Sequence, residues 1–179
     1  MTTYVAMLRG INVGGNNMIK MEALRALVTG LGHAEVATYI QSGNVIFQSQ
    51  AGAPARVIGG IEAGINETFG MAIAVILRTR EQLAGVVRDN PFLTRGTDPA
   101  TLHVIFLNEA PDPARLARLD PPQVAPDECR VVGTEIYARY PNGYGRSKMT
   151  NTFFEGRLGV RGTARNWKTV TKLLELAGG

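Results

Sequence analysis

The feature of this sequence that most constrains its fold is the order in which two apolar patterns follow each other. Short apolar runs are typical of buried strands, whereas apolar residues three and four positions apart are typical of one face of a helix. In the first half the patterns predict strand 4–8, helix 21–31, hairpin strands 36–40 and 45–47, helix 56–69 and strand 72–78. A strand-helix-strand-strand-helix-strand order is that of ferredoxin-like folds.

The same order begins again in the second half, after a short predicted helix near 81–88 and a turn at Asn90 and Pro91. The second set of predicted elements is strand 101–108, helix 112–119, a hairpin about Gly133 and Thr134, helix 147–158, a stub of strand at 159–162 and helix 164–177. The sequence therefore predicts an α+β protein with two ferredoxin-like β-α-β-β-α-β repeats and mainly antiparallel sheets. We expect a first subdomain over 1–79, a linking helix and loop over 80–100, and a second subdomain over 101–179 that includes the C-terminal helix.

Composition places the chain among globular proteins. Hydrophobic residues make up 45% of the 179 residues, which is enough for a substantial core. No stretch approaches the roughly 18 consecutive apolar residues of a membrane-spanning helix, and the N-terminal residues lack the pattern of a signal peptide. Cys129 is the single cysteine, so it has no partner for an intrachain disulfide. These features favour the reducing cytosol, and we expect a cytoplasmic protein with no membrane partner.

Positive charge is concentrated in the C-terminal third of the chain. The formal net charge of the whole chain is +4. Residues 1–129 contain ten Lys and Arg against twelve Asp and Glu, whereas residues 130–179 contain nine against three. The resulting net charge of +6 in the second segment favours an anionic partner there, and a solvated basic face is the alternative interpretation. No run of like charges is long enough to suggest an arm that binds nucleic acid.

Two polar segments of the first repeat are predicted to lie at one edge of its sheet. They are RGINVGGNN at 9–17, after the first strand, and QSGN at 41–44, within the hairpin. In a ferredoxin-like topology the first strand ends at the edge where this hairpin turns. The side chains expected along the edge are Arg9, Asn12, Asn16, Asn17, Gln41, Ser42 and Asn44.

The glycines of the segment 9–17 allow two interpretations. Where a strand meets a helix, free backbone N–H groups and the helix dipole favour an anion. Alternatively, Gly14 and Gly15 only supply the positive φ angles of a tight turn, and an asparagine caps the helix. The segment matches neither the dinucleotide-binding fingerprint nor the P-loop. Taken alone it favours the turn, whereas its predicted position beside 41–44 favours an edge that binds a ligand.

Basic residues of the second repeat are predicted to gather at another edge. The segment GYGRSK at 143–148 is expected to open a helix with Ser147 as its N-cap. The segment TARNWK at 163–168 is expected to open the last helix, with Thr163 as the cap and Arg165 and Asn166 in the first turn. A cation near a helix N-terminus opposes the dipole, which favours an anionic partner for it. The predicted cationic cluster is Arg146, Lys148, Arg165 and Lys168.

Other chemistry is sparse in the sequence. His33 and His103 are isolated, and neither has metal-ligand spacing to Cys129 or to an acidic residue, so we expect no metal and no cofactor. We find no nucleophile elbow and no pair of carboxylates that the topology places in a cleft. The catalytic residues, if the protein is an enzyme, stay unassigned.

Several of these segments also resemble a known family. They are YVAMLRGINVGGNNMIKMEALRALVTGLG, TYIQSGNVIF, YPNGYGRSKMTNTFFEGRLG and GTARNWKTVTKLLEL. Together they resemble the bacterial family known as domain of unknown function 1697, and the resemblance runs essentially from end to end. It implies two intertwined α/β subdomains of ferredoxin-like type and no established activity. The signature segments of that family correspond here to Arg9, Gly10, Asn12, Gly14, Gly15, Ser42, Gly43, Asn44, Arg165, Asn166 and Trp167.

We expect from these observations a cytosolic protein that binds an anionic, phosphate-containing ligand, with a nucleotide or RNA among the candidates. The alternatives are an enzyme that acts on a phosphorylated small molecule and a non-catalytic interaction module. The residues expected to bind the ligand are Arg9, Asn12, Gly14, Gly15, Ser42, Asn44, Arg146, Lys148, Arg165, Asn166 and Lys168.

Overall fold

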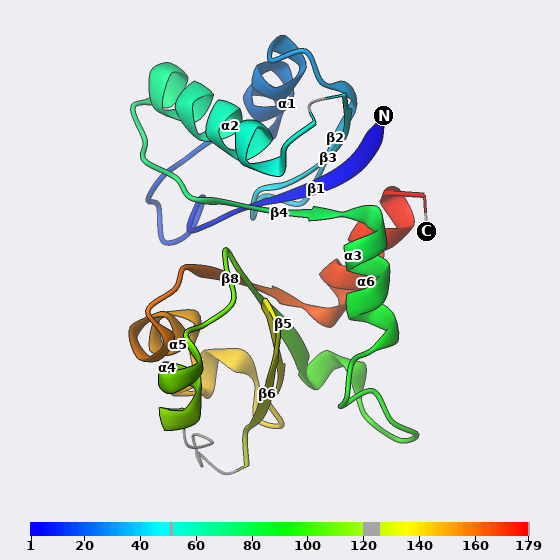
Figure 1. Cartoon of the computed structure of the whole chain (residues 1–179), viewed down its shortest axis with the longest axis vertical. Helices are drawn as coiled ribbons and strands as arrows, with labels where there is room; N and C mark the ends of the chain where they lie inside the picture. The colour runs from blue at the N-terminus through cyan, green and yellow to red at the C-terminus, as the bar shows by residue number, and fades with distance from the viewer. Residues whose placement is uncertain (51, 120–125, 179) are drawn as a thin grey trace. The chain divides into compact units, whose positions relative to one another are not determined.

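The structure, a computed structural model, describes residues 1–50, 52–119 and 126–178. The chain divides into two compact units, of which unit 1 comprises Met1–Ala84 with Leu173–Gly179 and unit 2 comprises Gly85–Lys172. Each unit contains one four-stranded antiparallel sheet (Figure 1). Among the described residues, no helix is both long and apolar enough to cross a membrane.

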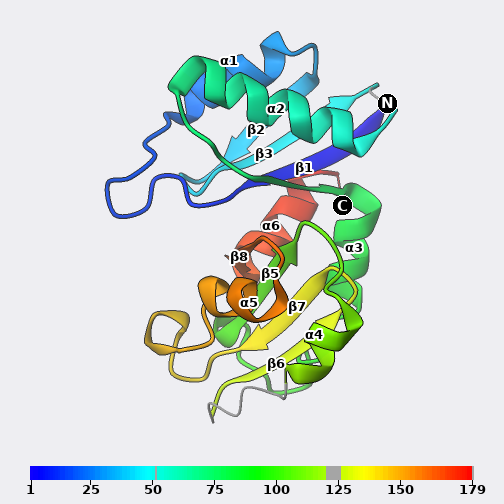
Figure 2. The same cartoon turned by 60° about the vertical axis from the view of Figure 1, so that its left-hand side comes forward.

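Unit 1 has the predicted order of elements. They are β1 (Thr2–Leu8), α1 (Met21–Gly30), β2 (Ala34–Tyr39), β3 (Asn44–Ser49), α2 (Pro54–Phe69) and β4 (Val75–Thr79). The strand order in the sheet is β2-β3-β1-β4. Both helices cover one face of this sheet (Figures 1 and 2), and their spaced apolar residues make the core there. Leu24 of α1, Ile61 and Ile65 of α2, and Ala6 and Leu8 of β1 are fully or almost fully buried in it.

Unit 2 repeats this arrangement. Its elements are β5 (Leu102–Leu107), α4 (Pro113–Arg118), β6 (Glu128–Val132), β7 (Glu135–Arg139), α5 (Asn151–Leu158) and β8 (Gly162–Asn166). The strand order β6-β7-β5-β8 corresponds strand by strand to that of unit 1. The core against α5 includes Ile105, Ile136, Tyr140 and Phe154, all fully buried. The predicted α+β fold with two β-α-β-β-α-β repeats is therefore confirmed.

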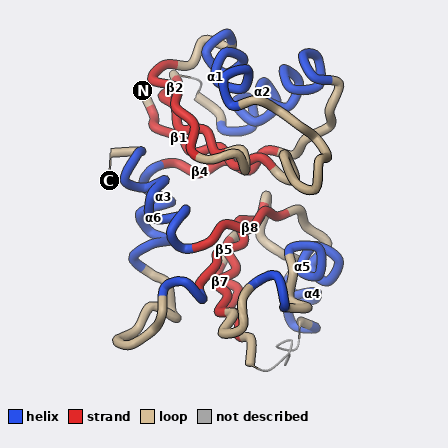
Figure 3. The backbone as a smooth tube through the Cα atoms, turned by 180° about the vertical axis from the view of Figure 1, so that it is seen from behind, coloured by secondary structure: helices blue, strands red, loops and turns tan. Residues whose placement is uncertain are grey.

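A helix directly follows the last strand of each repeat. After β4 the chain enters α3 (Arg80–Arg88), and after β8 it enters α6 (Trp167–Leu176), as Figure 3 shows. Each of these two helices begins in one unit and ends in the other. The repeated element order therefore extends to a seventh member. The sequence patterns predicted both helices, but they assigned 81–88 to a linker and so did not show that the two helices are equivalent.

Three predicted boundaries in the second repeat are wrong, and hydrogen bonding explains them. The last helix begins at Trp167 instead of 164, because Gly162–Asn166 pairs with β5 as strand β8. The strand predicted at 159–162 therefore shares only Gly162 with β8. The helix predicted over 147–158 begins at Asn151. Before it, the segment Tyr144–Arg146 forms a short 3₁₀ helix, and the side chain of Thr150 caps α5 by accepting from the Phe153 N–H at 3.3 Å.

Candidate functional site

The two polar segments at the edge of unit 1 are in contact, as the topology predicted. The Leu8 N–H donates to the Gly43 carbonyl at 2.8 Å. The side chain of Asn12 crosses between the two segments, with Nδ2 donating to the Gln41 carbonyl at 2.7 Å. Residues that are about thirty positions apart in the sequence thus form one joined edge beside the end of β1.

The amide side chains of this edge hold its own backbone in place. Asn12 Nδ2 also donates to the Ile19 carbonyl at 3.0 Å, while Asn12 Oδ1 accepts from the Ile19 N–H at 2.8 Å. Asn44 is fully buried, and its Nδ2 donates to the Tyr39 carbonyl and to Ser42 Oγ, both at 3.0 Å. These asparagines supply the hydrogen bonds that backbone groups without a sheet or helix partner require.

The glycines of the segment 9–17 supply a tight turn. Gly14 and Gly15 have φ angles of +58° and +77°, and the Asn16 N–H donates to the Val13 carbonyl at 3.0 Å. Two successive positive φ angles are typical of a type I′ turn, so the turn interpretation of these glycines is confirmed. The predicted asparagine cap is wrong, because α1 begins only at Met21 and its N-cap residue makes no side-chain cap bond.

Arg9 and Arg165 differ in burial: Arg9 is partly exposed, whereas Arg165 is buried. The Arg9 side chain is partly exposed beside the first segment, and its backbone N–H donates to the Ala74 carbonyl. Arg165 is buried in β8, where Nη1 donates to Thr163 Oγ1 at 2.7 Å and to the Ala164 carbonyl at 2.9 Å. Burial lowers the pKa of the Arg165 guanidinium to about 10, so the group stays cationic at neutral pH.

The predicted position of Arg165 in the first turn of the last helix is wrong. Since side chains alternate along a strand, Arg165 and Asn166 project from opposite faces of the sheet. Arg165 therefore does not lie on the sheet face from which Asn166 projects. The predicted role of Thr163 as a helix cap is also wrong, because Thr163 lies within β8 and pairs with Phe106 of β5.

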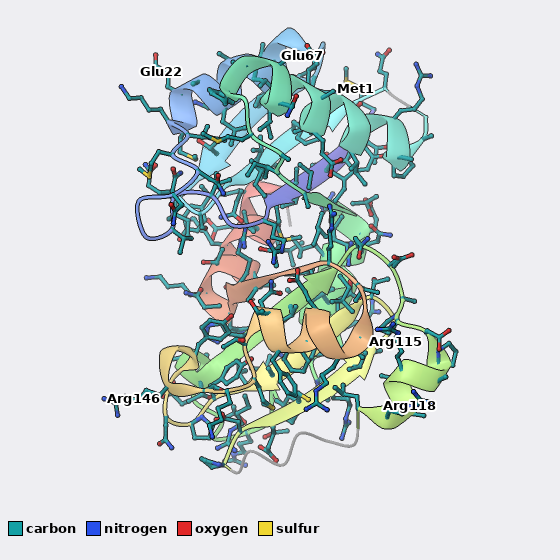
Figure 4. All side chains as sticks on the ribbon, turned by 90° about the vertical axis from the view of Figure 1, so that its left-hand side faces the viewer. Met1, Glu22, Glu67, Arg115, Arg118 and Arg146 are labelled. Atoms are coloured by element: carbon teal, nitrogen blue, oxygen red, sulfur yellow. The ribbon has the colours of Figure 1, made fainter. Side chains whose placement is uncertain are left out.

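Arg146 and Lys148 lie on an exposed loop between β7 and α5. Figure 4 shows Arg146 extending outward from this loop. The predicted N-cap role of Ser147 is wrong: its Oγ donates to Asp127 Oδ2 at 2.6 Å and accepts from the Met149 N–H at 2.9 Å. The loop therefore offers no helix N-terminus on which a phosphate would rest.

Aromatic contacts fix the position of this loop. The ring of Tyr144 stacks on His103 with the ring centroids 5.0 Å apart, and Tyr140 packs edge-on against both rings. His103 is the register partner of Asn166 in the β5–β8 pair. The loop and the start of α6 are therefore at the same edge of the sheet, as the topology predicted for these two segments.

A pocket of about 590 Å³ opens at the start of α6. Its lining residues are Asp98, Pro99, Ala100, Asn166, Trp167, Lys168 and Thr171. Two of the predicted ligand-binding residues, Asn166 and Lys168, meet here. Lys168 is exposed in the first turn of α6, and Trp167 beside it is only 6% exposed.

Both walls of the pocket are held by local hydrogen bonds. On one wall, Asn166 Oδ1 caps α6 by accepting from the Thr169 N–H at 2.8 Å. On the other wall, Asp98 Oδ1 accepts from the Ala100 N–H at 3.0 Å and so starts the 3₁₀ turn Pro99–Thr101. The sequence reasoning missed this second wall, because an Asp-Pro pair indicates a turn and says nothing about a partner some 70 residues away.

The charges of the pocket are arranged with opposite signs on its two walls. The Lys168 ammonium and the positive end of the α6 dipole lie on one wall, and the Asp98 carboxylate lies on the other. The lining therefore contains one cationic and one anionic side chain.

Burial shifts the pKa values of Cys129 and His103 away from neutrality. Burial raises the pKa of the Cys129 thiol to about 11, which keeps it protonated at neutral pH. His103 is largely buried, its Nδ1 has no hydrogen-bond partner among the described residues, and burial lowers its pKa to about 4. Within the described parts of the chain, no group of three His, Cys, Asp or Glu side chains is arranged to hold a metal ion.

Comparison with known proteins gives a family and a fold. The sequence profile of the family described as "Protein of unknown function (DUF1697)" matches residues 1–137. The match includes the joined edge of unit 1 but ends before Arg146 and the start of α6. The solved structure of conserved bacterial protein SP0830 from Streptococcus pneumoniae is similar to this chain, with 24% sequence identity, a TM-score of 0.77 and 98% of each chain covered. No curated protein matches the sequence.

Proposed function

This chain belongs to the DUF1697 family of proteins of unknown function, and we propose that it binds a small phosphate-bearing molecule in the pocket at the start of α6. The observation that carries this proposal is the position of Lys168. An exposed cation in the first turn of a helix opposes the helix dipole by roughly 0.3–1 kcal/mol. A bound anion reverses this effect, because the ammonium and the helix N-terminus then attract the same group.

The pocket also fits the body of an organic anion. Its volume of about 590 Å³ lies within the range of roughly 300–1,000 Å³ that is typical of small-molecule sites. Pro99, Ala100 and Trp167 line the pocket with apolar groups, and the Asp98 carboxylate has an oxygen available to a donor. A mononucleotide combines a phosphate, a planar ring and amino or hydroxyl donors, so it is our preferred ligand class.

The other predicted residues have different roles in this proposal. Arg146 and Lys148, on the loop at the same edge, add positive potential that attracts an anion without holding it. Arg165 supports the strand that leads into α6. The unit 1 edge takes no part, because the described side-chain bonds of Asn12 and Asn44 bind backbone and Ser42.

Calorimetric titration of the full chain with adenosine monophosphate and with adenosine tests this proposal. We expect the monophosphate to bind and adenosine to bind at least about tenfold more weakly, because adenosine lacks the group that Lys168 and the helix attract. Lys168→Gln is expected to weaken monophosphate binding by roughly 10- to 100-fold. Lys20→Gln, which removes an exposed lysine of unit 1, is the matched control.

The salt dependence of binding, measured with each ligand, distinguishes a mononucleotide site from an RNA site. One ammonium contact gives a shallow fall of affinity with salt, whereas an RNA that contacts several phosphates gives a steep one. The proposal is contradicted if the wild-type chain binds neither nucleoside nor nucleotide, or if Lys168→Gln binds the monophosphate as well as Lys20→Gln does.

A further inference from the structure

We propose that unit 2 contains a second anion site, separate from the pocket at the start of α6, which takes a phosphate monoester. This site is a pocket of about 360 Å³ between the segment 91–97 and the ends of two strands of the sheet. Its lining residues are Pro91, Phe92, Thr94, Arg95, Gly96, Thr97, Glu128 and Arg139. None of them lines the other pocket, so this proposal does not depend on the proposed function.

Two guanidinium groups give the pocket its charge. Arg139, at the end of β7, forms an ion pair with Glu128 of β6, with Nη1 and Oε2 2.9 Å apart. Arg95 extends from the connecting segment and is exposed, and it forms no ion pair with any residue that the structure describes. The three charged side chains therefore leave an excess of one positive charge in the pocket.

The Arg139–Glu128 pair is one that a ligand is able to displace. Its side chains are 40% and 53% exposed, and an exposed ion pair of this kind contributes little to stability. A phosphate group with two negative charges would contact Arg139 and Arg95 together, and guanidinium groups bind phosphate oxygens through paired hydrogen bonds. Glu128 is therefore an internal competitor for the ligand.

The loop that carries Arg95 is shaped by its own hydrogen bonds. Asn90 is buried, and its Oδ1 accepts from the Phe92 N–H at 3.0 Å. The Thr97 N–H donates to the Thr94 carbonyl at 3.1 Å, and Gly96 between them has a φ angle of +89°. These contacts define the conformation of the loop before any ligand binds, which lowers the entropic cost of binding.

The two threonines of this loop provide a hydroxyl donor. Thr94 Oγ1 and Thr97 Oγ1 lie 2.9 Å apart and share one hydrogen bond. Since each hydroxyl has one hydrogen, one of the two hydrogens is left for a phosphate oxygen. Phe92 and Pro91 add an apolar wall beside these polar groups. The combination favours a phosphate monoester with a small apolar or aromatic group over inorganic phosphate.

Titration of the ¹⁵N-labelled full chain with phenyl phosphate, followed by NMR, tests this proposal. We expect saturable shifts of the Gly96 and Thr97 amide signals, with weaker binding of inorganic phosphate. Glu128→Gln removes the competitor and is expected to bind phenyl phosphate up to about fivefold more tightly. Arg139→Gln and Arg95→Gln are each expected to weaken binding by at least about tenfold.

Matched variants distinguish binding in this pocket from binding elsewhere on the chain. Arg130→Gln removes an exposed arginine of β6 that does not line the pocket, and Lys168→Gln alters the other pocket. Both are expected to leave the Gly96 and Thr97 shifts unchanged, and amide spectra of all variants verify the fold. The proposal is overturned if these shifts are absent from the wild-type chain, if Glu128→Gln does not bind more tightly, or if Arg130→Gln loses as much affinity as Arg139→Gln.

Discussion

Gly43 lies where the turn after β2 meets the loop that follows β1, and no space exists beside it for a side chain. Its φ angle is +81°, and an added Cβ would lie 2.6 Å from Ile11 Cδ1 and 2.9 Å from Leu8 Cβ. The sequence predicted that these segments meet, but it did not indicate that a glycine permits the contact. Gly15 has a similar φ angle of +77° with no atom within 4 Å of such a Cβ.

Alanine substitution of these two glycines separates the effect of backbone strain on the free energy of unfolding from the effect of packing. Gly15→Ala is expected to cost about 1 kcal/mol of the free energy of unfolding, because only the left-handed backbone opposes it. Gly43→Ala is expected to cost roughly 2–4 kcal/mol, because Ile11 and Leu8 must also move. Urea unfolding of both variants checks this difference, and equal losses would show that Gly43 is not packed as described.

His103 makes the stability of the chain depend on pH. Burial lowers its pKa in the folded state from 6.5 to about 4, where it packs against Tyr140 and Tyr144. Above pH 6.5 the side chain is neutral in both the folded and the unfolded chain, so its titration costs no stability. As the pH falls from 6.5 towards 4, the unfolded chain takes up the proton first, and stability is lost.

The expected loss of unfolding free energy through His103 is roughly 1–3 kcal/mol, after allowance for its partial exposure. Unfolding measured between pH 7 and pH 4 is expected to be less pH-dependent in His103→Gln than in the wild-type chain. His33→Gln is the control, because burial lowers the pKa of His33 less than that of His103. An unchanged pH dependence in His103→Gln would contradict this assignment.

At the scale of elements, each repeat has a buried arginine at the equivalent position of its last strand. Arg78 in β4 and Arg165 in β8 are both buried, and each Nη1 donates to the carbonyl of the preceding residue at 2.9 Å. Val5 and Val104 are their register partners. Thr79 and Asn166 follow the two arginines and accept a bond from the N–H three residues later, at the start of α3 and α6. Only the alignment of the sheets reveals this correspondence.

Asn166 is expected to stabilise α6 as its N-cap. Asn166→Ala removes the acceptor for the Thr169 N–H and is expected to cost about 0.5–2 kcal/mol, whereas Asn166→Ser keeps an acceptor and is expected to cost less. Urea unfolding and amide exchange of Thr169 check the two variants. If serine and alanine destabilise the chain equally, Asn166 does not act through the cap.

The sequence predicted elements well where the apolar spacing is regular and poorly where strand pairing decides. Helices α1 and α2 were predicted because their apolar residues occupy one face. The start of α6 was not, because Thr163, Arg165 and Asn166 are polar residues that suit a helix start as readily as a strand. Pairing of Gly162–Asn166 with β5 settles the choice, and no local pattern encodes that pairing.

At the scale of the whole molecule, the order of elements was predicted, but the ligand pockets were not. The predicted edges exist in each repeat, yet proximity alone does not make a side chain available to a ligand. Asn12 is bonded to backbone, Arg165 is on the other face of its sheet, and Lys168 is exposed beside a pocket. One wall of each pocket comes from residues 91–100, which carry no motif.

The most direct test of the central proposal is an NMR titration of the ¹⁵N-labelled full chain with adenosine monophosphate. We expect saturable shifts of the Trp167 indole and of the Lys168 and Thr171 amides, and in Lys168→Gln we expect the shifts of the Trp167 indole and the Thr171 amide to require roughly 10- to 100-fold more ligand. Shifts confined to the amides of Gly14, Gly15 and Gly43 would place the ligand at the edge of unit 1 and contradict the proposal, as would a spectrum that does not change.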